Sequence, residues 1–490
     1  MYGATIGKTG ILGIDAATNQ AICAILPFNN IFIPKFGLYW LQSQRQNLIK
    51  QGFGGAQPNI NQGVIYNLSF PLSPLPEQHR IVSAIEERFT ILDAVTTALQ
   101  QNKQKLKLAR ASVLKHAVEG KLTEKWRAEH PATESGSELL ERILAERRAK
   151  WEAEQLAKGK DPRKLRYEEP NGPDMSELQD LPEGWEWTTL EQVTGAVRPI
   201  CYGILMPKEN IPDGIPYVKV KDMKGDKIDI AALHRTAPEI AAMYSRASLK
   251  PGDLLLAIRG TYGRIAEVPV ELEGANITQD TARLDVTKQM DRHFIATHLR
   301  SSISQKYFQK VSRGVAVKGV NIADVKLTPI TLPPFAEQQQ IVAEVERRLS
   351  VIEQAEVAIE TSLKRIERAR QSILERAFSG RLVPQDPNDE PASVLLERIQ
   401  EERGKRVAEG KQRGKNGGVK AVRGKKTKEQ EFVPQWQLLR DAKESGSIDE
   451  SLGHVGAHED GALGRGEVGQ GEMGKEELED LVQMPLLLWD

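Results

Sequence analysis

The feature of this chain that most limits its fold is an internal repeat of one long stretch. The first copy runs from Leu75 to Leu122 and the second begins at Phe335, and matching residues such as Glu77 and Glu337 lie 260 positions apart without a gap. A repeat at constant spacing means that a chain contains equivalent structural units. The chain therefore consists of two related parts, each with one copy of the stretch.

Each copy of the stretch carries an apolar residue at every seventh position. The row comprises Ile85, Leu92, Leu99, Leu106 and Val113 in the first copy, and Val345, Ile352, Ile359, Ile366 and Ile373 in the second. A heptad row sustained over several turns is typical of a coiled coil, in which the stripe is buried against another helix. An isolated amphipathic helix has similar spacing, but the second copy supplies a partner. The sequence therefore predicts two long helices that pack together.

The composition is that of an ordinary soluble protein, with 40% hydrophobic and 27% charged residues. The 67 basic and 67 acidic residues cancel, so any contact with nucleic acid must come from local patches. Cys23 and Cys201 have no metal-type spacing, which fits a reducing, intracellular compartment. No apolar run reaches the roughly 18 residues that span a bilayer, and the first residues lack the pattern of a secretory signal.

Two segments outside the repeat have the mixed pattern of an α/β-type domain. In residues 1–76 we predict strands at Ala21–Leu26 and Ile31–Ile33 and a helix at Gly37–Lys50; in residues 183–334 we predict strands at Pro216–Val220, Asp253–Arg259 and Ala282–Val286 and a helix at Phe294–Lys310. Gly54 and Gly314 open similar loops 260 positions apart. Residues 1–76 therefore correspond to the last part of the 183–334 domain.

The remaining segments are a connector and a tail. Residues 121–182 contain a predicted helix at Glu138–Gln155, whose Leu139–Ile143 motif recurs at Leu395–Ile399. After Arg403 large apolar residues become scarce, which predicts a disordered tail. The predicted segments are 1–76 (part of a first domain), 77–120 (first long helix), 121–182 (connector with a short helix), 183–334 (second domain), 335–403 (second long helix and a short helix) and 404–490 (low-complexity tail).

Motifs for catalysis are weak in this sequence. Gly3–Thr9 reads GATIGKT, which is one residue short of the spacing of a phosphate-binding P-loop. We therefore interpret it as a tight turn between strands. The sequence has no H-E-x-x-H, G-x-S-x-G or C-x-x-C motif, and its eight histidines are scattered. This pattern favours a recognition or scaffold protein over an enzyme.

Basic and amide side chains gather in the glycine-containing loops of the two domains. Arginine and lysine bind phosphates or guanine, and asparagine and glutamine can read adenine. Glycines beside them allow a loop to approach a ligand closely. The candidate DNA contacts are Lys219, Lys221, Arg259, Tyr262, Arg264, Arg313, Lys318 and Asn321 in the 183–334 domain, and Lys8, Gln57 and Asn59 in the first segment. Ordinary solvated surface is the simpler interpretation of any one of them.

Several motifs in these positions resemble a known family. The motifs are LPEQHRIV at Leu75–Val82, FAEQQQIV at Phe335–Val342, and LPEGWEWTTL at Leu181–Leu190, together with Tyr217-Val218-Lys219 and the PGDLL that precedes Arg259-Gly260. Over residues 1–403 the arrangement resembles the DNA-specificity subunit of a type I restriction-modification system. The two helix-entry motifs are specific in combination, whereas each domain motif alone is weak.

The resemblance implies a fold and a mechanism. The expected fold comprises two α/β (α+β) target-recognition domains and two long helices in an antiparallel coiled coil. Each domain would read one half of a bipartite double-stranded DNA site, and the helices would set the spacer between the halves. The subunit would be non-catalytic and cytoplasmic and would bind no cofactor. Two methyltransferase subunits would bind S-adenosylmethionine, and motor-nuclease subunits would use ATP and Mg²⁺.

The N-terminus departs from the family pattern. A member begins with a whole recognition domain, so the resemblance implies that the first half of that domain is absent here, through truncation, fragmentation or a misassigned start codon, and that reading of one half-site is impaired. Two other functions remain open: a coiled-coil scaffold without DNA specificity, and a nucleotide-binding enzyme based on Gly7-Lys8-Thr9. Co-purification with a methyltransferase would favour the DNA-specificity subunit, and ATP binding would favour the nucleotide-binding enzyme.

Overall fold

The computed structural model of the chain describes residues 5–26, 32–52, 59–314 and 318–416. It divides into two compact units, one formed by Met1–Val95 with Arg365–Asp490 and the other by Thr96–Lys364. Helices α4 (Leu75–Val118) and α11 (Phe335–Phe378) each have 44 residues and run through both units. Among the described residues, no helix is both long and apolar enough to cross a membrane.

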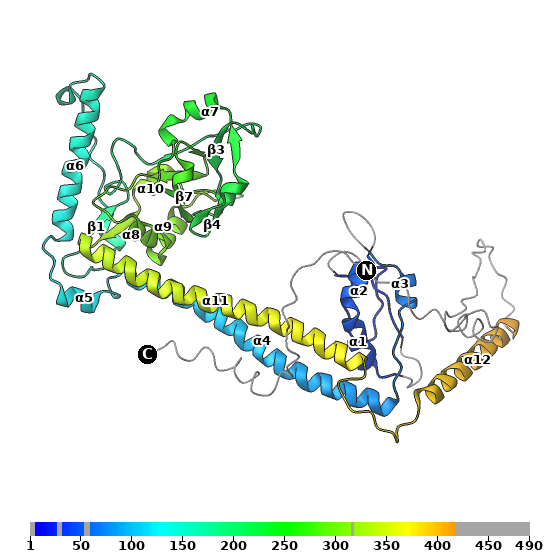
Figure 1. Cartoon of the computed structure of the whole chain (residues 1–490). Coiled ribbons are helices and arrows are strands. Elements are labelled where there is room, and N and C mark those ends of the chain that lie inside the picture. Colours follow the sequence, from blue (N-terminus) through cyan, green and yellow to red (C-terminus); the bar gives the residue numbers. More distant parts are fainter. Residues whose placement is uncertain (1–4, 27–31, 53–58, 315–317, 417–490) are drawn as a thin grey trace, which may run out of the picture. The chain divides into compact units, whose positions relative to one another are not determined.

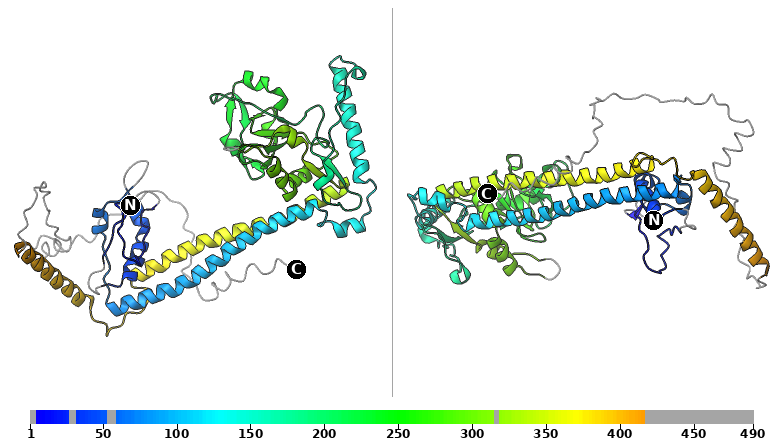
Figure 2. Two further views of the ribbon diagram at one scale, coloured as in Figure 1. Left: turned by 180° about the vertical axis from the view of Figure 1, so that it is seen from behind. Right: turned by 90° about the horizontal axis from the view of Figure 1, so that it is seen from below.

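In the unit Thr96–Lys364, α4 and α11 lie side by side (Figures 1 and 2). Lys103 pairs with Glu360 at 2.7 Å and Arg110 pairs with Glu356 at 3.2 Å, so residue numbers rise along one helix as they fall along the other. The buried heptad residues of this part include Leu99, Val113, Val345, Ile352 and Ile359. The predicted heptad stripe is therefore the buried seam of an antiparallel helix pair.

The unit Met1–Val95 with Arg365–Asp490 contains the other ends of the two helices, also antiparallel. Arg370 of α11 pairs with Asp93 of α4, and its guanidinium lies 4.9 Å from the ring centre of Phe89. The unit's other helices are α1 (Pro34–Ser43), α2 (Arg45–Lys50), α3 (Gln62–Tyr66) and α12 (Ala392–Asn416). Its core comprises Phe36, Ile81, Val82, Ile85, Leu374 and Ala377. The prediction of an antiparallel coiled coil is confirmed in both units.

The strands that the structure describes all lie between Glu186 and Leu332. They are β1 (Glu186–Thr189), β2 (Cys201–Tyr202), β3 (Ile215–Val218), β4 (Met223–Lys224), β5 (Lys227–Ile228), β6 (His234–Thr236), β7 (Leu254–Ala257), β8 (Ile265–Glu267), β9 (Asn276–Ile277), β10 (Thr281–Leu284) and β11 (Pro329–Leu332). They form sheets in the orders β2-β10-β7-β8, β6-β3-β9, β1-β11 and β4-β5. The three strands predicted in this domain are confirmed as β3, β7 and β10, each shorter than predicted.

Helices cover and connect these sheets. They are α5 (Glu124–Glu129), α6 (Gly136–Ala157), α7 (Pro238–Met243), α8 (Arg292–Arg300), α9 (Ser302–Val311) and α10 (Ile322–Lys326). The helix predicted at Phe294–Lys310 is two helices that meet at Ser301, and the one predicted at Gly37–Lys50 is α1 and α2, which meet at Gln44. An apolar period shows that a segment is helical but does not show where it breaks.

A buried glutamine joins the start of α11 to the adjacent domain. Gln338 is fully buried, and its Nε2 atom donates to the Pro333 carbonyl at 2.9 Å. Its Oε1 atom accepts from the Asp291 N–H at 2.9 Å, directly before α8. Because one side chain satisfies backbone groups on both sides of it, the helix and the domain are fixed together at this point.

The first repeat makes the same bonds. Gln78 is also fully buried, donates to the Ser73 carbonyl at 2.8 Å and accepts from the Ile33 N–H at 3.0 Å. The far ends of the long helices also match, because Gly120 and Gly380 adopt φ values of +72° and +71°. Such left-handed glycines end a helix by redirecting its backbone. The two copies of the repeat therefore share the same hydrogen bonds as well as a similar sequence.

Two predictions for the chain ends are wrong. Described residues 21–26 and 32–33 form no strand; Ile22 and Leu26 there are 56% and 82% exposed, so no packing holds these residues in a sheet. A short apolar run does not become a strand without a neighbouring strand. The prediction of a tail from residue 404 is wrong as far as Asn416, because Gly404–Asn416 belongs to α12. The rest of the predicted tail, residues 417–490, lies outside the described residues.

We predict that Gln338→Ala lowers the free energy of unfolding by roughly 2–4 kcal/mol, because it leaves buried backbone groups at Asp291 and Pro333 without partners. The matched control is Gln339→Ala, since Gln339 is exposed and adjacent. Its expected change is within about 0.5 kcal/mol. Urea unfolding followed by tryptophan fluorescence measures both, and equal losses for the two variants would contradict the assigned role.

We further predict that His298 makes stability depend on pH. Its Nε2 atom accepts from the Thr331 N–H at 3.0 Å and its Nδ1 atom lies 3.0 Å from the Ser304 hydroxyl, so the ring is neutral. Burial lowers the pKa of His298 from 6.5 to about 3. Because the unfolded chain binds more protons below pH 6.5, this stability is complete above pH 6.5 and is lost as the pH falls toward 3.

The expected loss from His298 is about 1.4 kcal/mol for each pH unit below 6.5. Urea unfolding at pH 7.5 and 5.5 should show this increment in the native chain and in His293→Gln, whose imidazole is 46% exposed. The increment should be absent in His298→Gln. The same pH dependence in His298→Gln and in the native chain would refute the assignment.

Candidate nucleic-acid interface

The first candidate loop is the turn between β7 and β8. The Gly263 N–H donates to the Ala257 carbonyl at 2.9 Å, and the Ala257 N–H donates to the Arg264 carbonyl at 2.8 Å, so the turn is tight. Gly263 has a φ of +81°, and a Cβ atom there would lie 2.4 Å from the Gln305 side chain. The sequence therefore needs glycine at this position to present Arg259, which precedes the turn, at the surface.

The second candidate loop follows α9 and is tied to the first by backbone hydrogen bonds. Arg313 and Gly319 exchange a pair of such bonds, at 2.8 and 2.9 Å. Gly319 also bridges to Arg259, and the Gly260 N–H donates to the Lys318 carbonyl at 3.2 Å. A Cβ atom on Gly319 would lie 3.0 Å from the Arg259 side chain, which explains the glycine. These bonds hold the two loops at a fixed distance.

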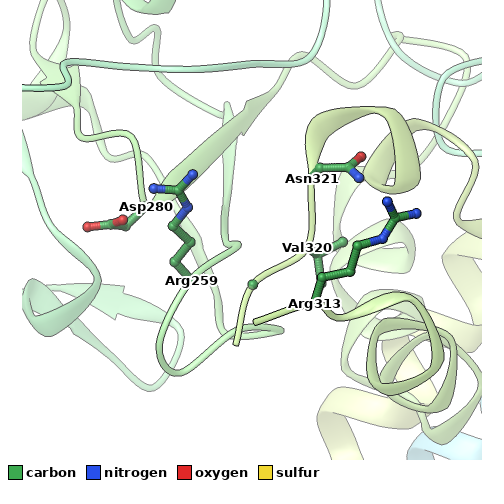
Figure 3. Close-up of a pocket in the computed structure, with 6 residues that line it drawn as sticks. Arg259, Asp280, Arg313, Val320 and Asn321 are labelled. Carbon is green, nitrogen blue, oxygen red and sulfur yellow. The ribbon is translucent and has the colours of Figure 1, made fainter. Parts of the chain in front are cut away.

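The loops border an open cavity of about 490 Å³. It is lined by Arg259, Asp280, Arg313, Gly319, Val320 and Asn321. Figure 3 shows Arg259 and Asp280 on one side of it, and Arg313 and Asn321 on the other. Both arginines are exposed; the Arg259 guanidinium lies 3.4 Å from Gln279 Oε1, and that of Arg313 lies 3.9 Å from Asp324. The cavity therefore offers cationic donors beside one carboxylate.

Asn321 has two roles that its side chain can satisfy together. Its Oδ1 atom accepts from the Asp324 N–H at 2.8 Å and caps α10. An asparagine at this position satisfies a helix-end N–H that would otherwise have no partner. The amide nitrogen is the donor that this cap does not use. Asn321 thus has a structural bond and a donor at the rim of the cavity.

Three other predicted residues lie on the side of the domain near β3 and β4. Lys219 follows β3, and its Nζ atom lies 5.0 Å from the ring centre of Tyr217. Lys221 is exposed in the short helix Val220–Asp222. The Arg264 guanidinium donates to the carbonyls of Val220 and Met223, at 3.3 and 2.9 Å, so it supports this segment from within the fold. None of the three lines the cavity.

The other predicted residues are distributed as follows. Lys318 is exposed, and its carbonyl accepts the hydrogen bond from Gly260 that joins the two loops. Tyr262 is half-buried against the hydrophobic core. In the first segment Lys8 is exposed and Asn59 is half-buried, while Gln57 lies outside the described residues. The structure therefore brings together Arg259, Arg313, Lys318 and Asn321.

The GATIGKT segment has a turn but not the surroundings of a P-loop. The Lys8 N–H donates to the Thr5 carbonyl at 3.1 Å, and Gly7 has a φ of +71°. A P-loop leads into a helix whose N-terminus faces the phosphate. Described residues 10–26 contain no helix and no strand. The interpretation as a tight turn is confirmed, but described residues 10–26 do not form the strand that was expected after it, and the strand expected before it falls outside the described residues.

The first segment repeats the local geometry around α10. Helix α3 is capped by Asn61, whose Oδ1 atom accepts from the Val64 N–H at 3.1 Å, just as Asn321 caps α10. Asn61 and Asn321 lie 260 positions apart. The same element thus follows the candidate loop in each half of the chain.

Sequence reasoning missed Asp280, which lines the cavity, and an ionic cluster around Asp253, which directly precedes β7. Asp280 is positioned by its carbonyl, which accepts from the Ile258 N–H at 2.8 Å. In the cluster, Arg198 binds Asp253 through two bonds of 2.8 and 2.7 Å and lies 3.2 Å from Asp285. Burial raises the pKa of Asp285. The only sequence signal was the position of Asp253 and Asp280 beside apolar strands, which many structural aspartates share.

Comparison with known proteins gives a consistent result. The model of the family described as "Type I restriction modification DNA specificity domain" matches residues 1–108 and 182–366. The specificity subunit of the type I restriction enzyme EcoBI from Escherichia coli is 27% identical over 397 residues, which cover 79% of this chain and 76% of that protein. The EcoKI specificity subunit from Escherichia coli strain K12 is 26% identical over 412 residues, covering 78% and 75%.

A solved structure has a similar fold. The matching chain comes from a study of complex assembly and conformational transition of the type I R-M system. The TM-score is 0.51 at 19% identity, and the match covers 72% of this chain and 73% of that chain. The family model matches both halves of the repeat, including the loops that border the cavity. This chain therefore belongs to the type I restriction-modification DNA specificity family.

Proposed function

We propose that this chain reads a bipartite double-stranded DNA site and that the cavity between the β7–β8 turn and the α9–α10 loop is one of its reading surfaces. The observation that supports this most is that the backbone of Gly319 is bridged to both Arg259 and Arg313, which brings the two arginines together. Both guanidinium groups are exposed, and the loops that carry them are joined by backbone bonds. A rigid support of this kind lowers the entropy lost when the side chains bind DNA.

The residues around the cavity match the chemistry of base edges. An arginine can donate two hydrogen bonds to the O6 and N7 atoms of guanine, and an asparagine pairs with adenine. A carboxylate such as that of Asp280 can accept from the amino group of cytosine. Arg259, Asp280 and Asn321 therefore provide donors and an acceptor for the edge of a base pair. Lys318, which is exposed nearby, is suited to a backbone phosphate.

We assign the second half-site to the first segment. Support comes from the repeat, since α3 and its cap Asn61 recur as α10 and Asn321. Lys8, Gln57 and Asn59 are the proposed contacts there. The paired helices α4 and α11 would set the unread spacer between the half-sites. A coiled coil is suited to this because its length is fixed by residue number, at about 1.5 Å for each residue.

The chemistry of the system would reside in partner subunits. We propose that the chain docks two methyltransferase subunits, which methylate adenine with S-adenosylmethionine, and that motor-nuclease subunits join and use ATP and Mg²⁺. The relatives are named as specificity subunits of type I restriction enzymes, which supports a non-catalytic role. Such an assembly would work in the cytoplasm, where the host DNA is methylated.

We predict that Arg259→Ala and Arg313→Ala each weaken binding to the target duplex by about ten- to a hundredfold, since each removes an arginine–base or arginine–phosphate contact. The target is first found by mapping adenine methylation in cells that express the chain with its methyltransferase subunits. Affinity is then measured with labelled duplex at several salt concentrations. A residue that contacts phosphate lowers the salt slope by about one, whereas a base contact changes sequence preference instead.

The matched control for these variants is Arg292→Ala. Arg292 is an exposed arginine of the same domain, pairs with Glu267 at 2.8 Å and does not line the cavity. A further variant, Asn321→Asp, keeps an oxygen to cap α10 but loses the amide donor and adds a negative charge. It should weaken binding without unfolding the domain. Native affinity in Arg259→Ala, Arg313→Ala and Asn321→Asp would refute the assignment of this cavity.

The coiled coil makes a separate prediction. Inserting one heptad into each of α4 and α11 at paired positions lengthens the pair by about 10 Å, or roughly three base pairs of duplex. The methylated site should then have a longer spacer, or lose recognition if the half-sites turn out of phase. The same seven residues inserted after Gly417 serve as the control and should change nothing. Methylation at the original spacer by the lengthened chain would contradict the proposed ruler.

A further inference from the structure

The loop between β2 and β3, residues 203–214, begins beside the cavity of the candidate interface. The Ile204 N–H donates to the Ile277 carbonyl at 2.7 Å, and the Ile204 carbonyl accepts from the Gln279 N–H at 2.9 Å. Gln279 Oε1 lies 3.4 Å from the Arg259 guanidinium, and Asp280, the next residue, lines the cavity. The start of this loop is therefore joined to the segment that forms one side of the cavity.

Glycine is required at the point where the loop leaves β2. A Cβ atom on Gly203 would lie 1.9 Å from the Ile277 carbonyl oxygen, so no side chain fits there. The Gly203 N–H also donates to the Thr278 carbonyl at 3.3 Å. Glycine therefore lets the loop backbone lie directly against the segment that leads to Gln279. The loop cannot move away from the cavity without losing these hydrogen bonds.

Two adjacent apolar side chains of this loop are exposed. Leu205 is 47% exposed and Met206 is 76% exposed, whereas Ile204 before them is fully buried. Met206 is two residues from Ile204, so their Cα atoms lie within about 8 Å of each other. Single exposed apolar residues are common on protein surfaces. Here two of them follow directly on the residue that is bonded to the side of the cavity, and neither is needed to fill the core.

The loop continues into a strained turn. Lys208 has a φ of +56°, and among the described residues it is the only residue other than glycine with a positive φ. The chain on both sides of it is fixed to β6. The Pro207 carbonyl accepts from the Thr236 hydroxyl at 2.8 Å. Asn210 Oδ1 accepts from the Arg235 N–H at 2.7 Å. Backbone strain persists only where surrounding contacts impose it, and it is concentrated at functional sites. The exposed apolar pair is therefore held between two fixed ends of the loop.

The polar side chains around the cavity cannot recognise one feature of a DNA base. In the major groove, thymine presents an O4 acceptor and a C5-methyl group. Arginine, aspartate and asparagine bind donors and acceptors, but a methyl group is recognised by an apolar contact. Such a contact would also remove the apolar surface of Leu205 and Met206 from water, which is favourable. The exposed pair therefore has the chemistry that the rest of the cavity lacks.

We propose that Leu205 and Met206 contact the C5-methyl group of a thymine in the half-site that the cavity reads, and that they are specificity-determining residues. This inference rests on the proposed function, because it takes the cavity as a surface that reads DNA. The loop supplies the apolar contact, and Arg259, Asp280 and Asn321 supply hydrogen bonds to neighbouring base edges. A loop fixed at both ends suits this role, because little entropy is lost when it binds.

Removing the methyl group from the DNA tests this contact directly. Each thymine at a specified position of the target duplex is replaced, one at a time, by uracil, which lacks only the C5-methyl group. The target is the one found by mapping adenine methylation, and affinity is measured with the full chain assembled with its methyltransferase subunits. We expect one replacement to weaken binding by the native chain about fourfold, because one buried methyl group is lost.

Matched variants assign this loss to the loop. A chain that carries both Leu205→Ala and Met206→Ala should bind the thymine duplex about tenfold more weakly and should no longer distinguish thymine from uracil. Both side chains are exposed, so the variant should remain folded. The control is Met243→Ala, because Met243 is 74% exposed on α7 of the same domain and does not line the cavity. It should keep the native affinity and the fourfold difference.

Three results would overturn the proposal. The first is that uracil has no effect at any position in the native chain. The second is that the double variant keeps the thymine preference of the native chain. The third is that the double variant loses methyltransferase subunits instead, which would assign the exposed pair to a protein partner.

Failure of the proposed function gives a different result. If the cavity does not read DNA, Arg259→Ala and Arg313→Ala retain the native affinity, and the thymine contact is refuted with it. If those two variants weaken binding while the double variant and the uracil duplexes behave as the native pair, the cavity reads DNA and only the thymine contact is refuted.

Discussion

The structure depends on the antiparallel contact between α4 and α11. Neither helix could keep its apolar row in water, because a stripe of this kind is stable only when another surface covers it. Each row covers the other, and residues such as Leu99 and Ile359 are each only 7% exposed. Ion pairs such as Lys103–Glu360 lie at the edge of the seam and contribute less than burial does. These pairs cross from one helix to the other and agree with the antiparallel alignment of the two.

A series of contacts connects the start of α11 to the candidate interface. Gln338 holds the Asp291 N–H directly before α8, and α8 leads into α9. Gln305 of α9 donates to the Gly263 carbonyl at 3.1 Å and so supports the turn that presents Arg259. The loop at Gly319 is tied to that turn in its own right. Loops that would otherwise be mobile are thus held by a helix whose own position the coiled coil fixes.

The repeat and the heptad row were enough to predict the long helices. Both depend only on the spacing of residues, which can be read from the sequence without knowledge of the fold. The glycine-containing loops indicated Arg259, Arg313 and Asn321 as candidate contacts, and the structure places all three at the cavity. The loop pattern could not separate these from Arg264, whose guanidinium turns inward to two carbonyls. That distinction depends on where the neighbouring strands lie. The buried roles of His298 and Gln338 were hidden for the same reason, since their partners are distant in sequence.

The two glutamates at the helix starts show how a repeat constrains what must accompany it. A carboxylate loses the solvation of water when it is buried, and the cost is offset only when donors surround it. Glu337 has such donors in Thr123, Arg127 and Trp185. Glu77 lies in an equivalent position with the same helix behind it, so the same donors would offset its burial.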